Sequence, residues 1–163
     1  MALVLLAPLG VTPARGQELL DRVMATIGGR PVTLTDVTLA RGLGLVTSDA
    51  GPDAESDAVR QLIDRRLLAI ELARLPPREP SAEAIDAEVA RLRQRAGTAW
   101  AALLRATGYD EPSVRDLARE TLRIAAYLMQ RYGAGASVSS PEARQLLSDL
   151  RLRAQVQVVT DAR

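Results

Sequence analysis

Residues 22–37, RVMATIGGRPVTLTDV, decide which fold the chain is expected to adopt. Val23, Ala25 and Ile27 fall on one side of a strand of period two, and a Gly-Gly pair follows directly. Glycine readily takes the positive φ angles that a tight turn between antiparallel strands requires. The stretch therefore predicts a β-hairpin at the start of the fold.

The return strand of this hairpin is expected to lead into a short helix. Pro31 has no backbone N–H, so the strand over 31–34 should be short or lie at a sheet edge. Thr35 suits the N-cap of the helix and Asp36 its first turn, and the helix should end near Gly42.

A different interpretation is that the same region is a DNA-binding helix-turn-helix motif. VTLTDVTLARGLG (32–44) resembles the opening of a bacterial helix-turn-helix repressor. Such a repressor needs a second helix immediately afterwards, with side chains suited to phosphates and base edges. The following residues, LVTSDAGPDAESD (45–57), instead contain a proline and several carboxylates, which repel DNA. The hairpin interpretation is therefore preferred.

Apolar residues at helical spacing predict that helices fill the middle of the chain. The helices expected after the first span 53–75, 81–96, a short segment around 100–107, 110–132, and a last segment starting at 140–141. One stripe of the 53–75 helix should face the core, and it comprises Val59, Leu62, Ile63, Leu67 and Ile70. The inward face of the 110–132 helix should comprise Val114, Leu117, Leu122, Ala125 and Leu128. Leu68, Leu72 and Leu75 lie off the first stripe, so that helix is either central or offers a second surface.

A strand is predicted at the end of the chain, because polar and apolar residues alternate in AQVQVV (154–159) and the stretch is rich in β-branched residues. A single strand needs a partner, and the other strand signal is the hairpin at the opposite end. We therefore expect a mainly α fold with a small β-sheet formed by the N-terminal hairpin and the C-terminal strand.

The composition limits the possible chemistry. The chain of 163 residues contains no Cys, no His and no Lys. These absences exclude disulfides, thiolate and imidazole sites, Ser-His-Asp catalysis and Schiff bases. The glycines lack the spacing of a P-loop or a Rossmann motif. We expect no enzyme activity, no cofactor and no metal site.

The charge balance gives no reason to expect nucleic acid as a partner. The formal net charge is +1, from 21 basic and 20 acidic residues, which creates no long-range field for nucleic acid or an anionic membrane. Aromatic residues make up 2% of the chain, so no platform for stacking bases is expected.

Residues 1–16, MALVLLAPLGVTPARG, have the features of a truncated signal peptide. An apolar run over 2–9 is followed by Ala14 and Gly16 at the −3 and −1 positions of a cleavage site before Gln17. The run is shorter than the roughly 20 residues of a spanning helix, so no stable membrane span is expected. The expected location is the periplasm, and a frayed N-terminus is the alternative.

Four further stretches occur in a fixed order: LLDRVMATIGGRPVTLTDV (19–37), VRQLIDRRLLAIELARL (59–75), IDAEVARLRQRAG (85–97) and TGYDEPSVRDLARETLRIAAYLMQRYG (107–133). In this order they resemble the N-terminal chaperone region of the SurA family of periplasmic chaperones and parvulin-type prolyl isomerases. SSPEARQLLSDLRLRAQVQVV (139–159) is similar to the C-terminal helix and strand of that region. The resemblance implies one SurA-N-like chaperone domain over 17–163.

The chain departs from the family where a parvulin domain is normally inserted. Only GAGASVSS (133–140) joins the helix ending at Tyr132 to the one beginning near Pro141, and the His side chains of a parvulin site are absent. The resemblance therefore implies a chaperone module without isomerase activity. In the family this module holds unfolded outer-membrane or secreted polypeptides in an apolar crevice without ATP.

A holdase of this kind needs an exposed, adaptable apolar surface on a rigid support. The candidate client-binding residues are Leu39, Leu43, Leu45, Leu68, Leu72, Leu75, Ile124, Tyr127 and Met129. Each of them could instead pack against a neighbouring helix. A second hypothesis is a non-catalytic module that forms a homodimer or docks on an envelope protein. The third, a prolyl isomerase, conflicts with the composition.

Overall fold

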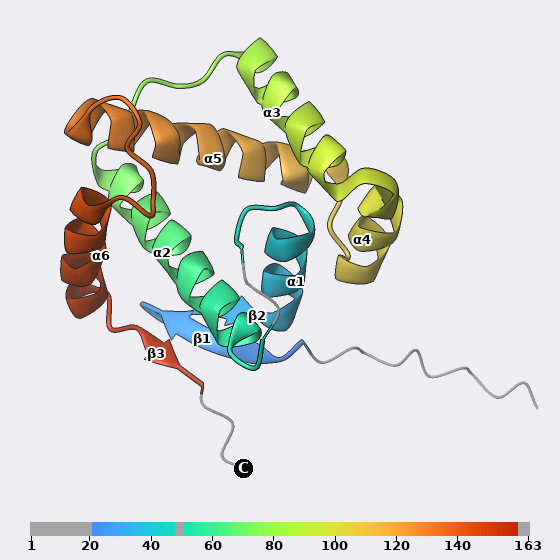
Figure 1. The fold of residues 1–163 in the computed structure, drawn as a ribbon, viewed down its shortest axis with the longest axis horizontal. Coiled ribbons are helices and arrows are strands. Elements are labelled where there is room, and N and C mark those ends of the chain that lie inside the picture. The colour runs from blue at the N-terminus through green and yellow to red at the C-terminus, as the bar shows by residue number, and fades with distance from the viewer. Residues whose placement is uncertain (1–20, 48–50, 160–163) are drawn as a thin grey trace, which may run out of the picture.

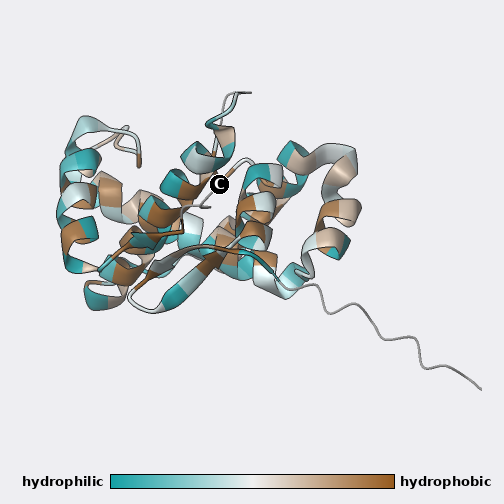
Figure 2. Ribbon diagram, turned by 90° about the horizontal axis from the view of Figure 1, so that it is seen from below, coloured by the Kyte–Doolittle hydropathy of each residue, from teal (hydrophilic) through white to brown (hydrophobic). Residues whose placement is uncertain are grey.

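The chain forms a mainly helical structure with one small antiparallel sheet, as the sequence predicts (Figure 1). The computed structural model describes residues 21–47 and 51–159, so the expected signal peptide lies outside the described residues. In Figure 1 the sheet lies at the bottom, α5 (Glu111–Tyr132) crosses the top, and α2 (Ala54–Arg74) runs diagonally between them. Hydrophobic and hydrophilic residues are interspersed along the helices (Figure 2), as in helices that pack part of their surface against a core.

The predicted hairpin is confirmed. β1 (Val23–Ile27) pairs antiparallel with β2 (Arg30–Thr33), with a bulge near the start of β1. Gly28 and Gly29 have φ angles of 55° and 80°, which define the type I′ turn whose twist matches that of the flanking strands.

The helix after the hairpin, α1 (Leu34–Gly42), ends where expected but begins earlier. Its N-cap is Thr33 and not Thr35, so that prediction was wrong. Thr33 Oγ1 accepts a hydrogen bond from the Asp36 N–H at 3.2 Å, and Asp36 Oδ2 accepts one from the Thr33 N–H at 3.1 Å. This reciprocal capping box satisfies two donors that a helix start otherwise leaves unpaired, and Thr35 in that position would satisfy neither.

The middle helices begin and end at the predicted residues. α3 (Ala82–Ala96) has Ser81 as its N-cap, and a single 3₁₀ turn (Gly97–Ala99) leads into α4 (Trp100–Thr107). Gly108 takes a left-handed φ of 70° that ends α4. The N-cap of α5 is Asp110, as predicted.

The predicted pairing of the two ends of the chain is also confirmed. α6 (Pro141–Arg153) is followed by β3 (Gln157–Val158), which adds to the free side of β1 and gives the strand order β2-β1-β3. The strand is shorter than the predicted 154–159. Two backbone hydrogen bonds extend the contact, from Val159 N to Met24 O at 2.9 Å and from Gly28 N to Ala154 O at 3.1 Å.

The core consists of two apolar clusters. The first lies among the sheet, α2, α6 and the C-terminal half of α5, and the second among α3, α4 and the N-terminal half of α5. α1 contributes to both, since Val37 and Ala40 belong to the first cluster and Leu39 and Leu43 to the second. The two clusters are therefore joined through α1 and α5.

α2 is the central helix of the first cluster. Leu68 and Leu72, which lie off its predicted stripe, are buried, whereas Ile70 on that stripe is 42% exposed. α2 packs against the sheet, α1, α5 and α6, so it buries more than one side. On α5, Ala125 is exposed, which corrects its predicted inward position, because the helix turns Ile124 and Leu128 to the core instead.

Candidate binding groove

Most of the residues predicted to bind clients lie in the core. Leu39, Leu43, Leu68, Leu72, Ile124 and Tyr127 are buried. The expectation that these side chains form an exposed surface was therefore wrong. The reason is that α1, α2 and α5 each pack against several neighbours, so their second apolar sides are covered as well.

The remaining three candidates are accessible to different degrees. Leu45 is half-buried, whereas Leu75 is 63% exposed and Met129 is 57% exposed. The last two lie at the C-terminal ends of α2 and α5, on the same side of the molecule in Figure 1. Because the other six are buried, the nine predicted residues do not form one continuous exposed surface.

The structure brings a different set of residues together in a groove of about 690 Å³. Four parts of the chain that are distant in sequence line it: the β1–β2 hairpin, the second half of α2, Glu120 of α5, and the end of α6 with the two residues that follow it. The apolar lining comprises Ile27, Pro31, Val32, Ala69, Ile70, Ala73 and Ala154. The groove therefore lies where the first core cluster reaches the surface.

α2 supplies the middle of this apolar lining. Ala69, Ile70 and Ala73 follow one another on a single face of the helix, because residues i and i+4 are neighbours there. The two alanines are too short to fill the space beside the hairpin, and Ile70 stands partly exposed between them. This combination leaves an aliphatic hollow instead of a closed core.

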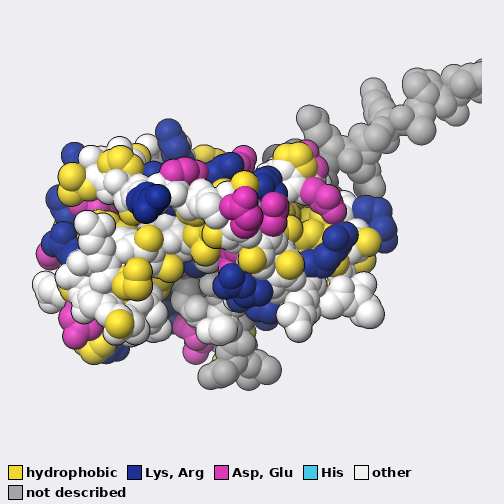
Figure 3. Space-filling model, turned by 90° about the horizontal axis from the view of Figure 1, so that it is seen from above, with side chains coloured by type: hydrophobic (Ala, Val, Ile, Leu, Met, Phe, Trp, Pro, Cys, Tyr) yellow, Lys and Arg dark blue, Asp and Glu magenta, His cyan; other side chains and the backbone are white. Residues whose placement is uncertain are grey.

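The groove carries more positive than negative charge. Arg30, Arg66 and Arg153 line it together with a single carboxylate, Glu120. Arg66 Nη2 lies 3.7 Å from Asp36 Oδ1, and Arg153 Nε donates to the Asp149 carbonyl at 3.4 Å. Within residues 21–47 and 51–159, Arg30 takes part in no ion pair. By contrast, basic and acidic side chains are interspersed over the face shown in Figure 3.

At one end the groove meets the interface of α2 and α5. Arg65 Nη2 donates to Thr121 Oγ1 at 2.8 Å, and burial lowers the pKa of Arg65 although the nearby Glu120 carboxylate opposes this. A second hollow of about 250 Å³ shares Ala69 and Glu120 with the groove. The two hollows are therefore adjacent along α2.

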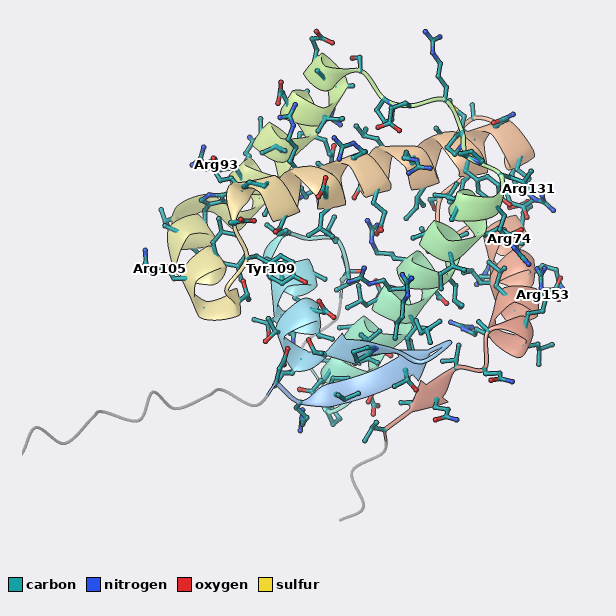
Figure 4. The ribbon with its side chains drawn as sticks, turned by 180° about the vertical axis from the view of Figure 1, so that it is seen from behind. Arg74, Arg93, Arg105, Tyr109, Arg131 and Arg153 are labelled. Atoms are coloured by element: carbon teal, nitrogen blue, oxygen red, sulfur yellow. The ribbon has the colours of Figure 1, made fainter. Side chains whose placement is uncertain are left out.

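At its other side, Arg66 connects the groove to a polar contact that fixes the hairpin and α1. Tyr109, between α4 and α5, donates its hydroxyl to Asp36 Oδ1 at 2.6 Å (Figure 4). Burial and this bond to a carboxylate raise the pKa of Tyr109 to about 12. The contact links residues 73 positions apart and ties α1 to the N-terminal end of α5.

We expect the Tyr109→Phe variant to lose stability at pH 8 but not at pH 12. The pKa of a tyrosine in the unfolded chain is about 10, so the raised value in the fold adds stability that is complete below pH 10 and lost as the pH rises through about 12. For this half-buried group the loss at pH 8 should be about 1 kcal/mol. Urea unfolding of the parent protein and the variant at both pH values measures this loss. If the two proteins differed by the same free energy of unfolding at pH 8 and at pH 12, the stabilising role of the Tyr109 hydroxyl would be contradicted.

The described residues offer little for other chemistry. Across 21–47 and 51–159, no three carboxylates gather in a way that could hold a metal ion. Burial raises the pKa of Asp64, but its neighbour is Arg151 at 2.5 Å and it does not line the groove. No helix in these ranges is long and apolar enough to cross a bilayer. What the groove can do is hold an aliphatic group beside guanidinium groups.

Comparisons with known proteins add no further assignment. The chain matches no family model, no curated protein and no solved structure. The resemblance to the SurA family therefore rests on the order of the motifs in the sequence.

Sequence reasoning missed the groove although part of its signal was present. Ala69 and Ala73 are one turn apart beside Ile70, a pattern typical of a shallow hollow on a helix face. Its other walls come from the hairpin, from Glu120 of α5 and from residues 153–155, and helical spacing gives no information about such distant partners.

Proposed function

We propose that the protein is an ATP-independent periplasmic holdase of the SurA type, without isomerase activity, that binds unfolded outer-membrane or secreted polypeptides in this groove. The observation that carries the proposal is the aliphatic groove itself. It is a partly open hollow on packed elements, and its volume is in the range of about 300–1,000 Å³ that ligand sites occupy.

The shape of the groove suits weak and reversible binding. Each Leu or Val side chain of a client that becomes buried contributes about 1.5–3 kcal/mol. Association and ordering of an unfolded segment cost at least about 4 kcal/mol, so a few such side chains give only weak binding. A client can then be released without nucleotide, as a holdase requires.

The architecture agrees with what the sequence resemblance implies. A hairpin at the start and a strand at the end form one sheet, and the helices between them carry the two core clusters. This agreement supports the proposal at the level of the fold. The client class and the periplasmic location rest on the resemblance and on the expected signal peptide.

The test is suppression of aggregation of an unfolded outer-membrane protein, measured by light scattering without nucleotide. The chain should suppress scattering as its molar ratio increases. Ile70→Ser should weaken this by about tenfold, because one aliphatic contact of about 1.4 kcal/mol is lost. The matched control is Leu152→Ser, an aliphatic residue of α6 that is 82% exposed and does not line the groove.

The control separates the possible outcomes. Full suppression by Leu152→Ser together with weak suppression by Ile70→Ser supports a holdase that uses the groove. An equal effect of both changes contradicts the groove as the client site. Failure of the well-folded parent protein to suppress aggregation contradicts the holdase proposal.

A second candidate is a non-catalytic docking or dimerisation module, which one of the two edges of the sheet, that of β3, favours. The two-residue turn makes Ile27 and Arg30 a hydrogen-bonded pair. Because backbone groups alternate in direction along a strand, the backbone nitrogens of Pro31 and Thr33 point away from β1, toward the free edge of the sheet. Pro31 has no N–H and that of Thr33 is bound to Asp36, so this edge presents no free donor.

The edge of β3 is different. The bond from Val159 N to Met24 O means that the backbone groups of Val158 point away from β1, and both valine side chains are exposed. This open edge could pair with a second copy of the chain. A dimer in light scattering that Val158→Asp converts to monomers would favour this candidate, and a monomeric parent protein would exclude the dimer.

A further inference from the structure

We infer that the groove prefers client segments in which aliphatic residues stand next to Asp or Glu, an inference that rests on the proposed holdase function. Aliphatic side chains of the client would occupy the hollow beside Ile70. Their acidic neighbours would meet the guanidinium groups of Arg30 and Arg153 on its rim.

The first argument is the local charge. The whole chain is nearly balanced, with 21 basic and 20 acidic residues. The groove is not balanced, since three arginines and one carboxylate line it. An occupant with negative charge therefore complements it, and a basic segment is repelled.

The second argument is that two of these guanidinium groups remain available. Arg30 has no ion-pair partner within the described ranges of the chain. Among the described residues, Arg153 bonds through its Nε to a carbonyl of its own helix, and its terminal nitrogens have no partner there and can meet a carboxylate. A guanidinium group can hold a carboxylate through two parallel hydrogen bonds.

The third argument is that the two arginines come from elements that are joined to each other. Arg30 lies at the end of the hairpin turn and Arg153 at the end of α6. The hydrogen bond from Gly28 N to Ala154 O, at 3.1 Å, fastens the hairpin turn to the segment after α6. The charged rim is therefore part of a defined site, and its spacing is set by the backbone.

The fourth argument is the contrast between the charged residues of the groove, Arg30 and Arg153, and its uncharged residues on α2. Ala69, Ile70 and Ala73 contribute no charge, so selection among aliphatic segments has to come from the rim. Partly exposed ion pairs each contribute a small gain in affinity, because water screens them. Two such pairs give an expected preference of about fivefold to tenfold, which salt should weaken.

The experiment measures binding of three fluorescent peptides to the full chain by anisotropy. The peptides share one aliphatic sequence and differ at four interspersed positions, which are all Glu, all Ser or all Arg. The Glu peptide should bind about fivefold to tenfold more tightly than the Ser peptide, and the Arg peptide most weakly. In about 0.5 M NaCl the Glu and Ser peptides should bind alike.

Variants locate the preference. Arg30→Gln together with Arg153→Gln should bring the ratio of the affinities for the Glu and Ser peptides to about one, because both charged partners of the Glu side chains are removed. The control is Arg105→Gln, because Arg105 is exposed on α4 at the opposite side of the molecule from Arg153 (Figure 4). Circular dichroism checks that each variant is folded.

The outcomes distinguish this inference from the holdase proposal. Equal affinities for the three peptides, or a preference that survives in the double variant, overturn the inference. If the protein suppresses aggregation but binds none of the peptides, the inference also falls and the holdase stands. A Glu preference without suppression of aggregation supports the charge selection and overturns the holdase.

Discussion

Replacing Leu68 by alanine is expected to lower the free energy of unfolding by about 2–5 kcal/mol. Leu68 is fully buried in the first core cluster, on the helix that this cluster surrounds. The shorter side chain loses its transfer free energy and leaves a cavity that the packed neighbours only partly fill. Urea unfolding followed by circular dichroism measures the change at pH 7.

The matched control is Leu75→Ala at the C-terminal end of the same helix. Leu75 is 63% exposed, so its removal should change the free energy of unfolding by no more than about 0.5 kcal/mol. Equal effects at the two positions would contradict the burial described for α2. Leu68 was one of the predicted client-binding residues. If its removal strongly destabilises the fold, a polar substitution at this position would report on folding and not on client binding.

Replacing Asp36 by alanine is expected to lower the free energy of unfolding by about 2–4 kcal/mol. The carboxylate accepts hydrogen bonds from the Thr33 N–H and the Tyr109 hydroxyl, and Arg66 lies 3.7 Å away. The change removes one half of the capping box and leaves a partly buried hydroxyl without its acceptor. Urea unfolding again gives the value.

Two further variants control this prediction. Asp36→Asn keeps the shape of the side chain and one acceptor oxygen but removes the charge. It should therefore lower the free energy of unfolding by less than Asp36→Ala does. Thr38→Ala removes an exposed side chain of the same helix, whose hydroxyl bonds to the Leu34 carbonyl, and should cost no more than about 0.5 kcal/mol. Alanine has a higher helix propensity than either residue, so equal losses for Thr38→Ala and Asp36→Ala would contradict the special contribution assigned to the Asp36 contacts.

Local chemistry explains why much of the fold could be predicted. A Gly-Gly pair adopts the positive φ angles of a hairpin turn wherever it occurs between strands. Ser81, Asp110 and Ser140 each accept a hydrogen bond from a backbone N–H three residues later, at the predicted helix starts. The wrong cap of α1 has the same basis, because Thr33 and Thr35 are both acceptable caps and the reciprocal bond with Asp36 selects the first.

The candidate site was less predictable because accessibility is not a local property. Leu68 and Ile70 are apolar and two positions apart on one helix, yet the first is in the core and the second lines the groove. The difference comes from what packs on each side of α2, and helical spacing carries no information about those partners. Six of the nine predicted client residues were buried for this reason.

The sequence by itself determined the elements of this protein, their order, most of their caps, and the absence of thiol, imidazole and lysine chemistry. These properties depend on backbone preferences and on interactions between residues that are close in the chain. The tertiary structure alone decided that Arg30, Ile70 and Arg153 share one groove and that the Gly28 N–H bonds to the Ala154 carbonyl. The physical reason is that these features require residues far apart in sequence to meet, and such meetings depend on packing of the whole chain.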